Sequence, residues 1–214
     1  MGDVTQGTRL VPSGPDTRRE STERRILEGA QALIDGGQRW HAIGIRQIAE
    51  HAEISRTAFY DFFGSKNEVL EHLIRGLHED LTVSLQESLD LGTIGRFDPQ
   101  LMRPTLQAVA AYAARHGYAY RAFLEATADD AGLATFWNEL LDAYARLVAA
   151  AIEGARAHDA TVPNAGDARA LARALILMTE RCLIAELDRE SDAGTVDALV
   201  EIWVRAVFGD TASS

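Results

Sequence analysis

The chain has 214 residues, of which 47% are hydrophobic and 25% charged, and its formal net charge is −11. This is the composition of an ordinary globular protein, and its single cysteine, Cys182, excludes an intrachain disulfide. The apolar runs are too short to span a bilayer and the N-terminus lacks a signal-peptide core. We therefore expect a cytoplasmic protein without membrane contact. Acidity argues weakly against a nucleic-acid partner, but residues 17–66 carry one more basic than acidic side chain.

Apolar residues recur at helical spacing, and no run alternates as a strand would. Residues 1–20 are polar and contain Gly and Pro, so we expect a disordered N-terminal arm. A first helix follows and ends at Gly36-Gly37, and a second short helix is expected from Ile45. A third helix begins after Ser55, whose hydroxyl can cap free backbone N–H groups.

A fourth helix is expected from Asn67 into the high 80s, interrupted by no proline and only by Gly76. The Gly- and Pro-bearing segment 89–99 predicts a linker. Further helices are expected at 100–116, 118–129, 132–157, 166–188 and 194–208, with a loop at 158–166. The sequence therefore predicts an all-α protein of about nine helices, with a small three-helix head on a larger C-terminal bundle.

Two short helices within about 45–63, separated by the segment "AEIS", predict a helix-turn-helix. The first turn of the second helix would carry Arg56 and Thr57, where a recognition helix meets base edges in the major groove. Nearby polar groups can reach phosphate oxygens. The candidate DNA-binding residues are Arg46, Ser55, Arg56, Thr57, Tyr60 and Lys66. The rings of Phe59, Phe62 and Phe63 are expected to pack the head. Periodicity alone favours this interpretation no more than a helical hairpin with a solvated polar face.

The segment "IAEHAEISRTAFYDFFGSKNEVL" (48–70) resembles the helix-turn-helix signature of the TetR family of transcriptional regulators. The matching features are Ile48-Ala49, Ala52, Ile54-Ser55, Phe59-Tyr60, Phe63, Ser65-Lys66 and Leu70. The segment "RRILEGAQALIDGG" (24–37) is similar to the first helix of that family. The resemblance implies a DNA-binding domain at 21–66, a ligand-binding and dimerisation domain at 67–214, and a homodimer.

A second resemblance covers "FWNELLDAYARLVAAAIE" (136–153), "LMTERCLIAEL" (177–187) and "TVDALVEIWVRAVFG" (195–209). These segments are similar to the subgroup of mycobacterial ethionamide-resistance repressors, which have a long apolar ligand pocket. By position, the residues lining such a pocket would be Met102, Trp137, Tyr144, Ile176, Thr179 and Trp203. The resemblance thus implies an apolar small-molecule effector, with Thr179 as its main hydroxyl partner.

The chain departs from the family pattern at several positions. Glu53 stands where the family usually has Gly, and a non-Gly residue in a left-handed turn costs about 1 kcal/mol. Gly44 replaces the common Ser or Thr cap of the second helix and is a weaker cap. Ile176 and Thr179 replace the pocket amides of the related repressors, so the polarity of the ligand does not carry over.

The last two predicted helices have wide apolar faces, which predict that two chains pair through them as a four-helix bundle. The residues concerned are Leu171, Leu175, Leu177, Met178, Cys182, Ile184, Leu187, Val196, Leu199, Val200, Trp203 and Val207.

No catalytic motif, phosphate loop or metal-ligand spacing appears, so we expect no enzyme, cofactor or metal. Two functions remain open. The first is a regulator, in the simplest case a repressor released from a palindromic operator by an apolar small molecule. The second is a helical small-molecule-binding or enzymatic protein that has lost DNA binding.

Overall fold

The computed structural model describes residues 15–88, 98–159, 162–163, 166–187 and 193–209, and all regular structure in these residues is helical. The head consists of α1 (Pro15–Asp35), the 3-10 helix η1 (Trp40–Ala42), α2 (Ile45–His51) and α3 (Arg56–Tyr60). A long helix, α4 (Lys66–Ser88), follows. The body consists of α5 (Pro99–Arg115), α6 (Gly117–Thr127), α7 (Ala131–His158), α8 (Ala168–Glu186) and α9 (Ala193–Phe208). The predicted all-α architecture is confirmed.

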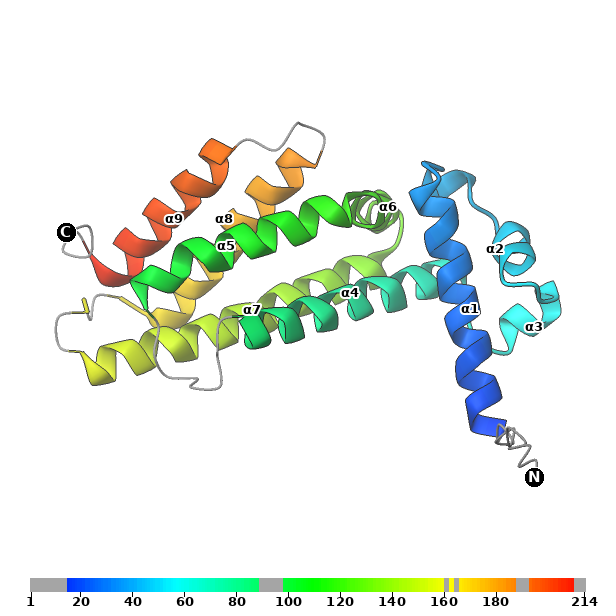
Figure 1. Ribbon diagram of the computed structural model, residues 1–214, viewed down its shortest axis with the longest axis horizontal. Helices are drawn as coiled ribbons and strands as arrows, with labels where there is room; N and C mark the ends of the chain where they lie inside the picture. The colour runs from blue at the N-terminus through cyan, green and yellow to red at the C-terminus, as the bar shows by residue number, and fades with distance from the viewer. Residues whose placement is uncertain (1–14, 89–97, 160–161, 164–165, 188–192, 210–214) are drawn as a thin grey trace, which may run out of the picture.

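The molecule is elongated, with the head at one end and α9 at the other (Figure 1). The long helix α4 leaves the head and runs into the body, where α5 packs along α9 and α7 packs along α8 (Figure 1). No helix in the described part of the chain is long and apolar enough to cross a membrane.

The buried apolar side chains form two clusters. One joins the head to the near half of the body, since Ile26, Phe59 and Phe63 of the head share it with Phe123 and Phe136 of α6 and α7. The other fills the far half of the body between α5, α7, α8 and α9. Because the first cluster is continuous across the junction, the head is not packed independently of the body.

The crossing of α1 and α2 depends on a buried glycine. A Cβ atom on Gly29 would lie 3.1 Å from the Cβ of His51 and 3.2 Å from the backbone of α2. Those contacts are tighter than most real Cβ contacts, so a side chain here would push the two helices apart. Gly29 therefore fixes how closely α1 supports the first helix of the helix-turn-helix.

Some helix boundaries differ from the expected ones. α1 begins at Pro15, inside the segment expected to be a disordered arm, and a proline suits a first helical position because its φ is already fixed. Residues 1–14, and most of the predicted linker 89–99, lie outside the described residues. α3 ends at Tyr60, three residues before the predicted end, and Phe62 and Phe63 both bond back to the carbonyl of Phe59 in a turn.

The apolar faces expected to pair two chains are mostly used within one chain. The far cluster contains five of them as buried residues, namely Leu175, Leu199, Val200, Trp203 and Val207. Four more are partly buried and pack against it, namely Leu171, Met178, Cys182 and Val196. The reason is that α5 packs along α9 and α7 packs along α8. These faces therefore need no second chain to cover them, contrary to the expectation from the sequence. Their burial within one chain says nothing about whether the protein is a dimer.

Candidate nucleic-acid interface and effector region

The turn of the helix-turn-helix is a Schellman motif built on a non-glycine residue. The N–H of Ile54 donates to the carbonyl of Ala49 (3.0 Å), and that of Glu53 donates to the carbonyl of Glu50 (3.2 Å). Glu53 has φ +52°, which confirms the expected left-handed conformation. The guanidinium of Arg25 on α1 donates to the carbonyls of Ala52 and of Glu53, the latter at 3.1 Å. Arg25 thus braces a turn that lacks its usual glycine.

Replacing Glu53 by glycine is expected to raise the free energy of unfolding by about 0.5–1 kcal/mol, because the left-handed strain disappears. The exposed Arg25–Glu53 ion pair, 3.5 Å long, contributes little. Chemical denaturation measures the change. Glu50→Gly is the matched control, because Glu50 lies inside α2, where glycine costs about 1 kcal/mol. If both variants are destabilised equally, the turn at Glu53 carries no strain.

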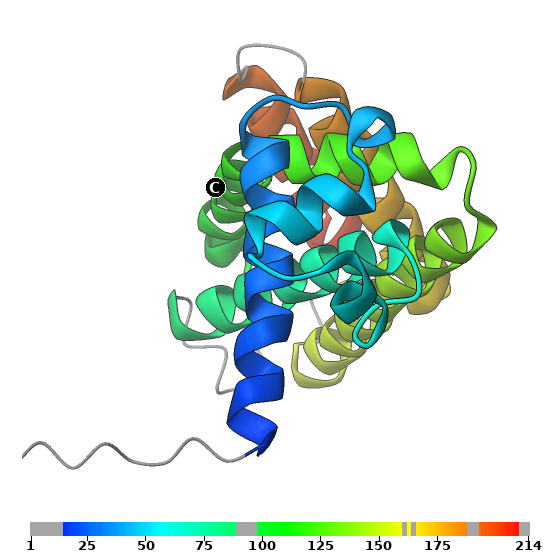
Figure 2. The same ribbon diagram turned by 90° about the vertical axis from the view of Figure 1, so that its right-hand side faces the viewer.

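The second helix of the motif presents a polar surface to solvent. Ser55 caps α3 by accepting a hydrogen bond from the N–H of Ala58 (3.0 Å), as expected. Arg56, Thr57 and Tyr60 are all exposed, whereas Phe59 on the opposite side is fully buried. The guanidinium of Arg56 lies 5.9 Å from the ring centroid of Tyr60, one helical turn on. Figure 2, which views the molecule from the head end, shows α2 and α3 on the outer surface.

Basic groups flank this surface, and the sequence indicated only one of them. Arg46 at the start of α2 is exposed and pairs with Glu50 at 3.2 Å. Arg19 of α1 donates to the carbonyl of Asp61, just after α3, at 3.4 Å, and lies over the ring of Phe62. No sequence pattern singled out Arg19, because it lies 42 residues from Asp61 along the chain. Arginine side chains thus lie at the start of α2 and just after the end of α3.

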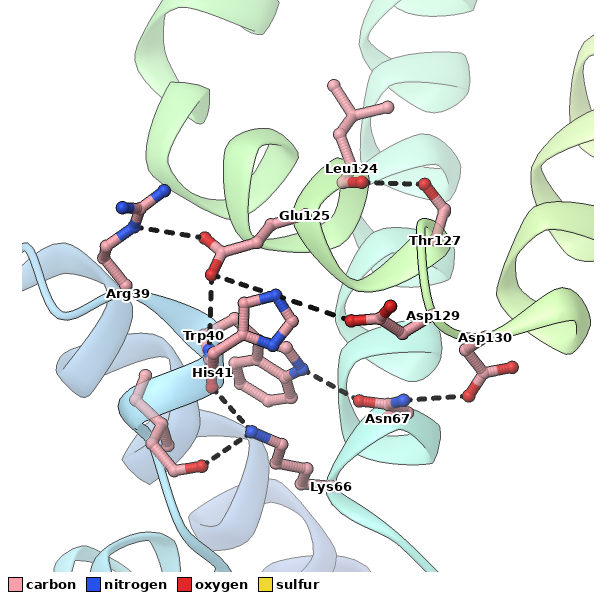
Figure 3. A network of polar contacts seen from close by, with 11 residues as sticks. Arg39, Trp40, His41, Lys66, Asn67, Leu124, Glu125, Thr127, Asp129 and Asp130 are labelled. Carbon is pink, nitrogen blue, oxygen red and sulfur yellow. Dashed lines mark hydrogen bonds and ion pairs between the residues drawn. The ribbon is translucent and has the colours of Figure 1, made fainter.

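Lys66 does not extend toward solvent as a phosphate contact would require. Its Nζ donates to the carbonyls of Trp40 (2.6 Å) and Ile43 (2.8 Å) and lies over the indole of Trp40 (Figure 3). Burial lowers the pKa of the Lys66 ammonium, and the nearby Glu125 carboxylate partly opposes this. In this arrangement Lys66 holds the 39–43 loop, which precedes α2, against the start of α4. The expectation of an outward anchor rested on position alone, which does not fix where a long side chain points.

Replacing Lys66 by methionine is expected to lower the free energy of unfolding by about 1–3 kcal/mol, since two backbone carbonyls lose their donor. The salt dependence of DNA binding should stay unchanged, because no phosphate contact is lost. Denaturation and a salt titration on DNA measure the two effects. A slope lowered by about one, with unchanged stability, would restore Lys66 as a phosphate contact.

The six predicted effector residues divide between two regions. Met102 and Trp203 belong to the far cluster, with Ile176 packed against it. The indole N–H of Trp203 donates to the hydroxyl of Thr179 at 2.8 Å, so the expected ligand partner already has an internal bond. Trp137 packs against the near cluster and donates to Glu180 at 3.0 Å. Tyr144 hydrogen-bonds to His78, whose ring centroid also lies 5.6 Å from that of Trp137.

Tyr144 belongs to a buried polar group centred on His78 of α4. Its hydroxyl lies 3.0 Å from Nδ1 of His78 and 3.3 Å from the hydroxyl of Thr82. The Tyr120 hydroxyl lies 3.5 Å from Nε2 of the same imidazole. Burial lowers the pKa of His78 to about 4, so the ring is neutral near pH 7. No sequence pattern singled out His78, because the tyrosines that its imidazole contacts lie 42 and 66 residues away.

Two family models match the chain. Residues 26–73 match bacterial regulatory proteins of the tetR family, and residues 102–209 match the C-terminal domain of the transcriptional regulator EthR. The first match covers the helix-turn-helix described above and the second covers most of the body. Both describe transcriptional regulators, which confirms the expectation that the chain is not an enzyme.

Individual proteins agree with these matches. The HTH-type transcriptional regulator EthR of Mycobacterium tuberculosis is 30% identical over 207 residues, covering 94% of each chain. EthR of Mycolicibacterium smegmatis is 30% identical over 203 residues, covering 92% of this chain and 89% of the relative.

Among solved structures, Salmonella enterica GusR superposes with a TM-score of 0.64 at 16% identity, covering 91% of this chain and 97% of that one. Thermus thermophilus FadR, a TetR-family repressor in complex with lauroyl-CoA, superposes with a TM-score of 0.61 at 18% identity, covering 86% and 94%. These two support the fold. Together with the matched models and the 30% identity to EthR over nearly the whole chain, they show that the protein belongs to the TetR family and has a C-terminal domain of the EthR type.

Proposed function

We propose that this protein is a homodimeric repressor that binds a palindromic operator and releases it when an apolar small molecule binds the body. The observation that carries the proposal is the first turn of α3. Ser55 caps it, and Arg56, Thr57 and Tyr60 extend from it into solvent. An arginine at this place can bond the O6 and N7 atoms of guanine, and a threonine can contact a base or the methyl group of thymine.

The dimer would form through the sides of α8 and α9 that the far cluster leaves uncovered. Ile202 is 45% exposed on α9, and Leu177 and Ile184 are half-buried on α8. Exposed Ala174, Ala198 and Ala206 allow helices of two chains to approach closely. A two-fold dimer would place its recognition helices in major grooves about one turn apart, or roughly 34–36 Å.

The effector would bind in the body, among residues of α5, α7, α8 and α9. The apolar far cluster, together with the hydroxyls of Tyr144 and Thr179 and the indole of Trp137, supports a ligand that is mostly apolar with one hydrogen-bonding end. The acyl-CoA complex of Thermus FadR supports the same chemistry in a protein of this fold. An effector with a 100-fold preference for the DNA-free state supplies about 2.7 kcal/mol, which lowers the occupancy of an operator from about 90% to about 10%.

Fluorescence-polarisation titration of the full-length protein against the DNA upstream of its own gene tests the proposal. Saturable binding that exceeds binding to random DNA at moderate salt is expected. Equal binding to both sequences would contradict it. A thermal-shift screen of apolar compounds follows, and compounds that stabilise the protein should also release the operator. Stabilising compounds that all leave operator affinity unchanged would remove the effector from the proposal and leave DNA binding intact.

Light scattering tests the dimer in the same preparation. The protein should be a dimer at micromolar concentration, and Ile202→Glu should produce monomers with weakened operator binding. A wild-type protein that is already monomeric would overturn the proposed dimer face and the palindromic operator together.

A further inference from the structure

The 39–43 loop, which joins α1 to the first helix of the helix-turn-helix, lies between α4 and the body (Figure 3). On the α4 side, Lys66 binds two of its carbonyls, as described above. On the body side, the carboxylate of Glu125 on α6 lies 3.7 Å from Nε of Arg39 and 3.3 Å from Nε2 of His41. Any displacement of this loop changes the direction in which α2 starts, because Gly44 follows the loop directly as the cap of α2.

A hydrogen-bond relay crosses the same junction. The indole N–H of Trp40 in the loop donates to Oδ1 of Asn67 at 2.9 Å. The amide of Asn67, in the first turn of α4, donates to Oδ2 of Asp130 at 2.8 Å. Asp130 is the N-cap residue of α7 and accepts the N–H groups of Gly132 (2.9 Å) and Leu133 (3.2 Å) through its other oxygen. The side chain of Asn67 therefore connects the head to the start of α7 through α4.

The members of the relay are well suited to fix a geometry. Trp40 is 1% exposed, so its indole has little freedom to turn. Asp130 is held by its two backbone donors, and the hydrogen bond from Asn67 is the main cause of the lowered pKa of its carboxyl. The Asp130 carboxylate is consequently charged at neutral pH, and a charged acceptor strengthens the bond from Asn67.

The apolar cluster shared by head and body cannot supply this orientation alone. Apolar burial is non-directional and depends on the area removed from water, so small rotations of the head can preserve it. Hydrogen bonds weaken steeply when their lengths and angles change. The shared apolar core therefore holds the head against the body, and the polar groups at the junction determine the angle between them.

We infer that Asn67 and Asp130 are positioning residues that hold the DNA-binding head at its DNA-competent angle by fixing Trp40 to the start of α7. The inference rests on the proposed DNA-binding function, and it assigns the control of that site to residues that touch neither DNA nor effector. A shift of α7 in the body is transmitted through Asp130 and Asn67 to the loop that precedes the recognition helices.

The test uses variants that remove the two bonds of the relay together or one at a time. Asn67→Ala removes both relay bonds, Trp40→Phe removes the indole donor but keeps a ring, and Asp130→Ser removes the second oxygen but keeps a residue able to cap α7. Asn138→Ala is the matched control, because among the described residues the Asn138 amide bonds only the carbonyl of Ala134, within α7. Spin labels on cysteines at the exposed Ala32 of α1 and Ala150 of α7, in a Cys182→Ala background, report the head-to-body distance. Dilution with unlabelled protein isolates one labelled chain in each dimer.

The distance distribution between the labels should broaden in all three relay variants and remain narrow in Asn138→Ala. Operator affinity, measured where each variant is fully folded, should fall about tenfold in Asn67→Ala, which is the size of one net hydrogen bond. The salt slope should not change, because no phosphate contact is lost. The effects of Trp40→Phe and Asp130→Ser on the free energy of operator binding should be non-additive in the double variant. In an Asn67→Ala background the same two effects should add, because the residue that couples them is gone.

Unchanged distance distributions in the relay variants would overturn the inference, whatever the DNA measurements show. Broadened distributions with wild-type operator affinity would also overturn it, because the relay would then be structural only. If the wild-type protein binds no operator, the proposed function fails, and the label distances still decide whether the relay positions the head.

Discussion

Replacing Arg56 by alanine is expected to lower affinity for the operator by about 1–3 kcal/mol, or roughly tenfold to a hundredfold. The reason is the position of the guanidinium, which is exposed in the first turn of a capped recognition helix and lies beside the ring of Tyr60. Affinity for random DNA should fall much less, since a bidentate base contact exists only at the correct base pair. Preference should be lost at one base position in each half-site.

Two further variants separate base recognition from loss of charge. Arg56→Lys retains the charge but cannot make a bidentate contact, so it should behave much like the alanine variant on the operator. Arg146→Ala removes the same charge from an exposed site on α7 in the body and should leave the preference for operator DNA unchanged. Polarisation titrations of each variant against operator, single-base variants of the operator and random DNA provide the comparison. An even loss across all sequences for Arg56→Ala would show that this side chain contacts phosphate instead.

The largest effect on stability is expected from His78 under acid conditions. Burial lowers its pKa to about 4, whereas an unfolded histidine titrates near 6.5. Between these two values the unfolded chain binds a proton that the folded protein does not. The free energy of unfolding should therefore be fully retained above about pH 6.5 and should decrease as the pH falls toward 4. Below pH 4 the protonation of His78 should cause no further decrease. The difference between the two pKa values corresponds to about 3 kcal/mol.

His78→Gln isolates this contribution, because glutamine cannot take up the proton but can still bond the hydroxyls of Tyr120 and Tyr144. Denaturation curves at several pH values between 4 and 7 should show a flatter pH dependence for His78→Gln than for the wild type. His158→Gln serves as the control, since His158 is exposed at the end of α7 and bonds the carbonyl of Gly154 in the same helix. Parallel pH profiles for wild type and His78→Gln would show that His78 titrates normally in the folded protein.

The sequence was sufficient to predict features that depend on neighbouring residues. Helical spacing of apolar side chains gave the helices, because a helix places residues three and four apart on one face. The cap at Ser55 and the left-handed turn at Glu53 followed for the same reason, since both are set by backbone groups within a few residues. Even the outward placement of Arg56, Thr57 and Tyr60 is a consequence of the period of one helix whose other side carries Phe59.

Tertiary structure alone decided which groups meet across the chain. Lys66 turns inward because the carbonyls of Trp40 and Ile43, 26 and 23 residues away, lie within its reach. The indole N–H of Trp203 donates a hydrogen bond to the hydroxyl of Thr179. The apolar face of α9, which predicted a dimer, is covered by α5 of the same chain. Asn67 bonds both Trp40, which lies 27 residues before it, and Asp130, which lies 63 residues after it. Periodicity states which side of a helix is apolar, but it does not state which element covers that side. The direction of a long or polar side chain depends on the partners that folding brings within about 3 Å of it.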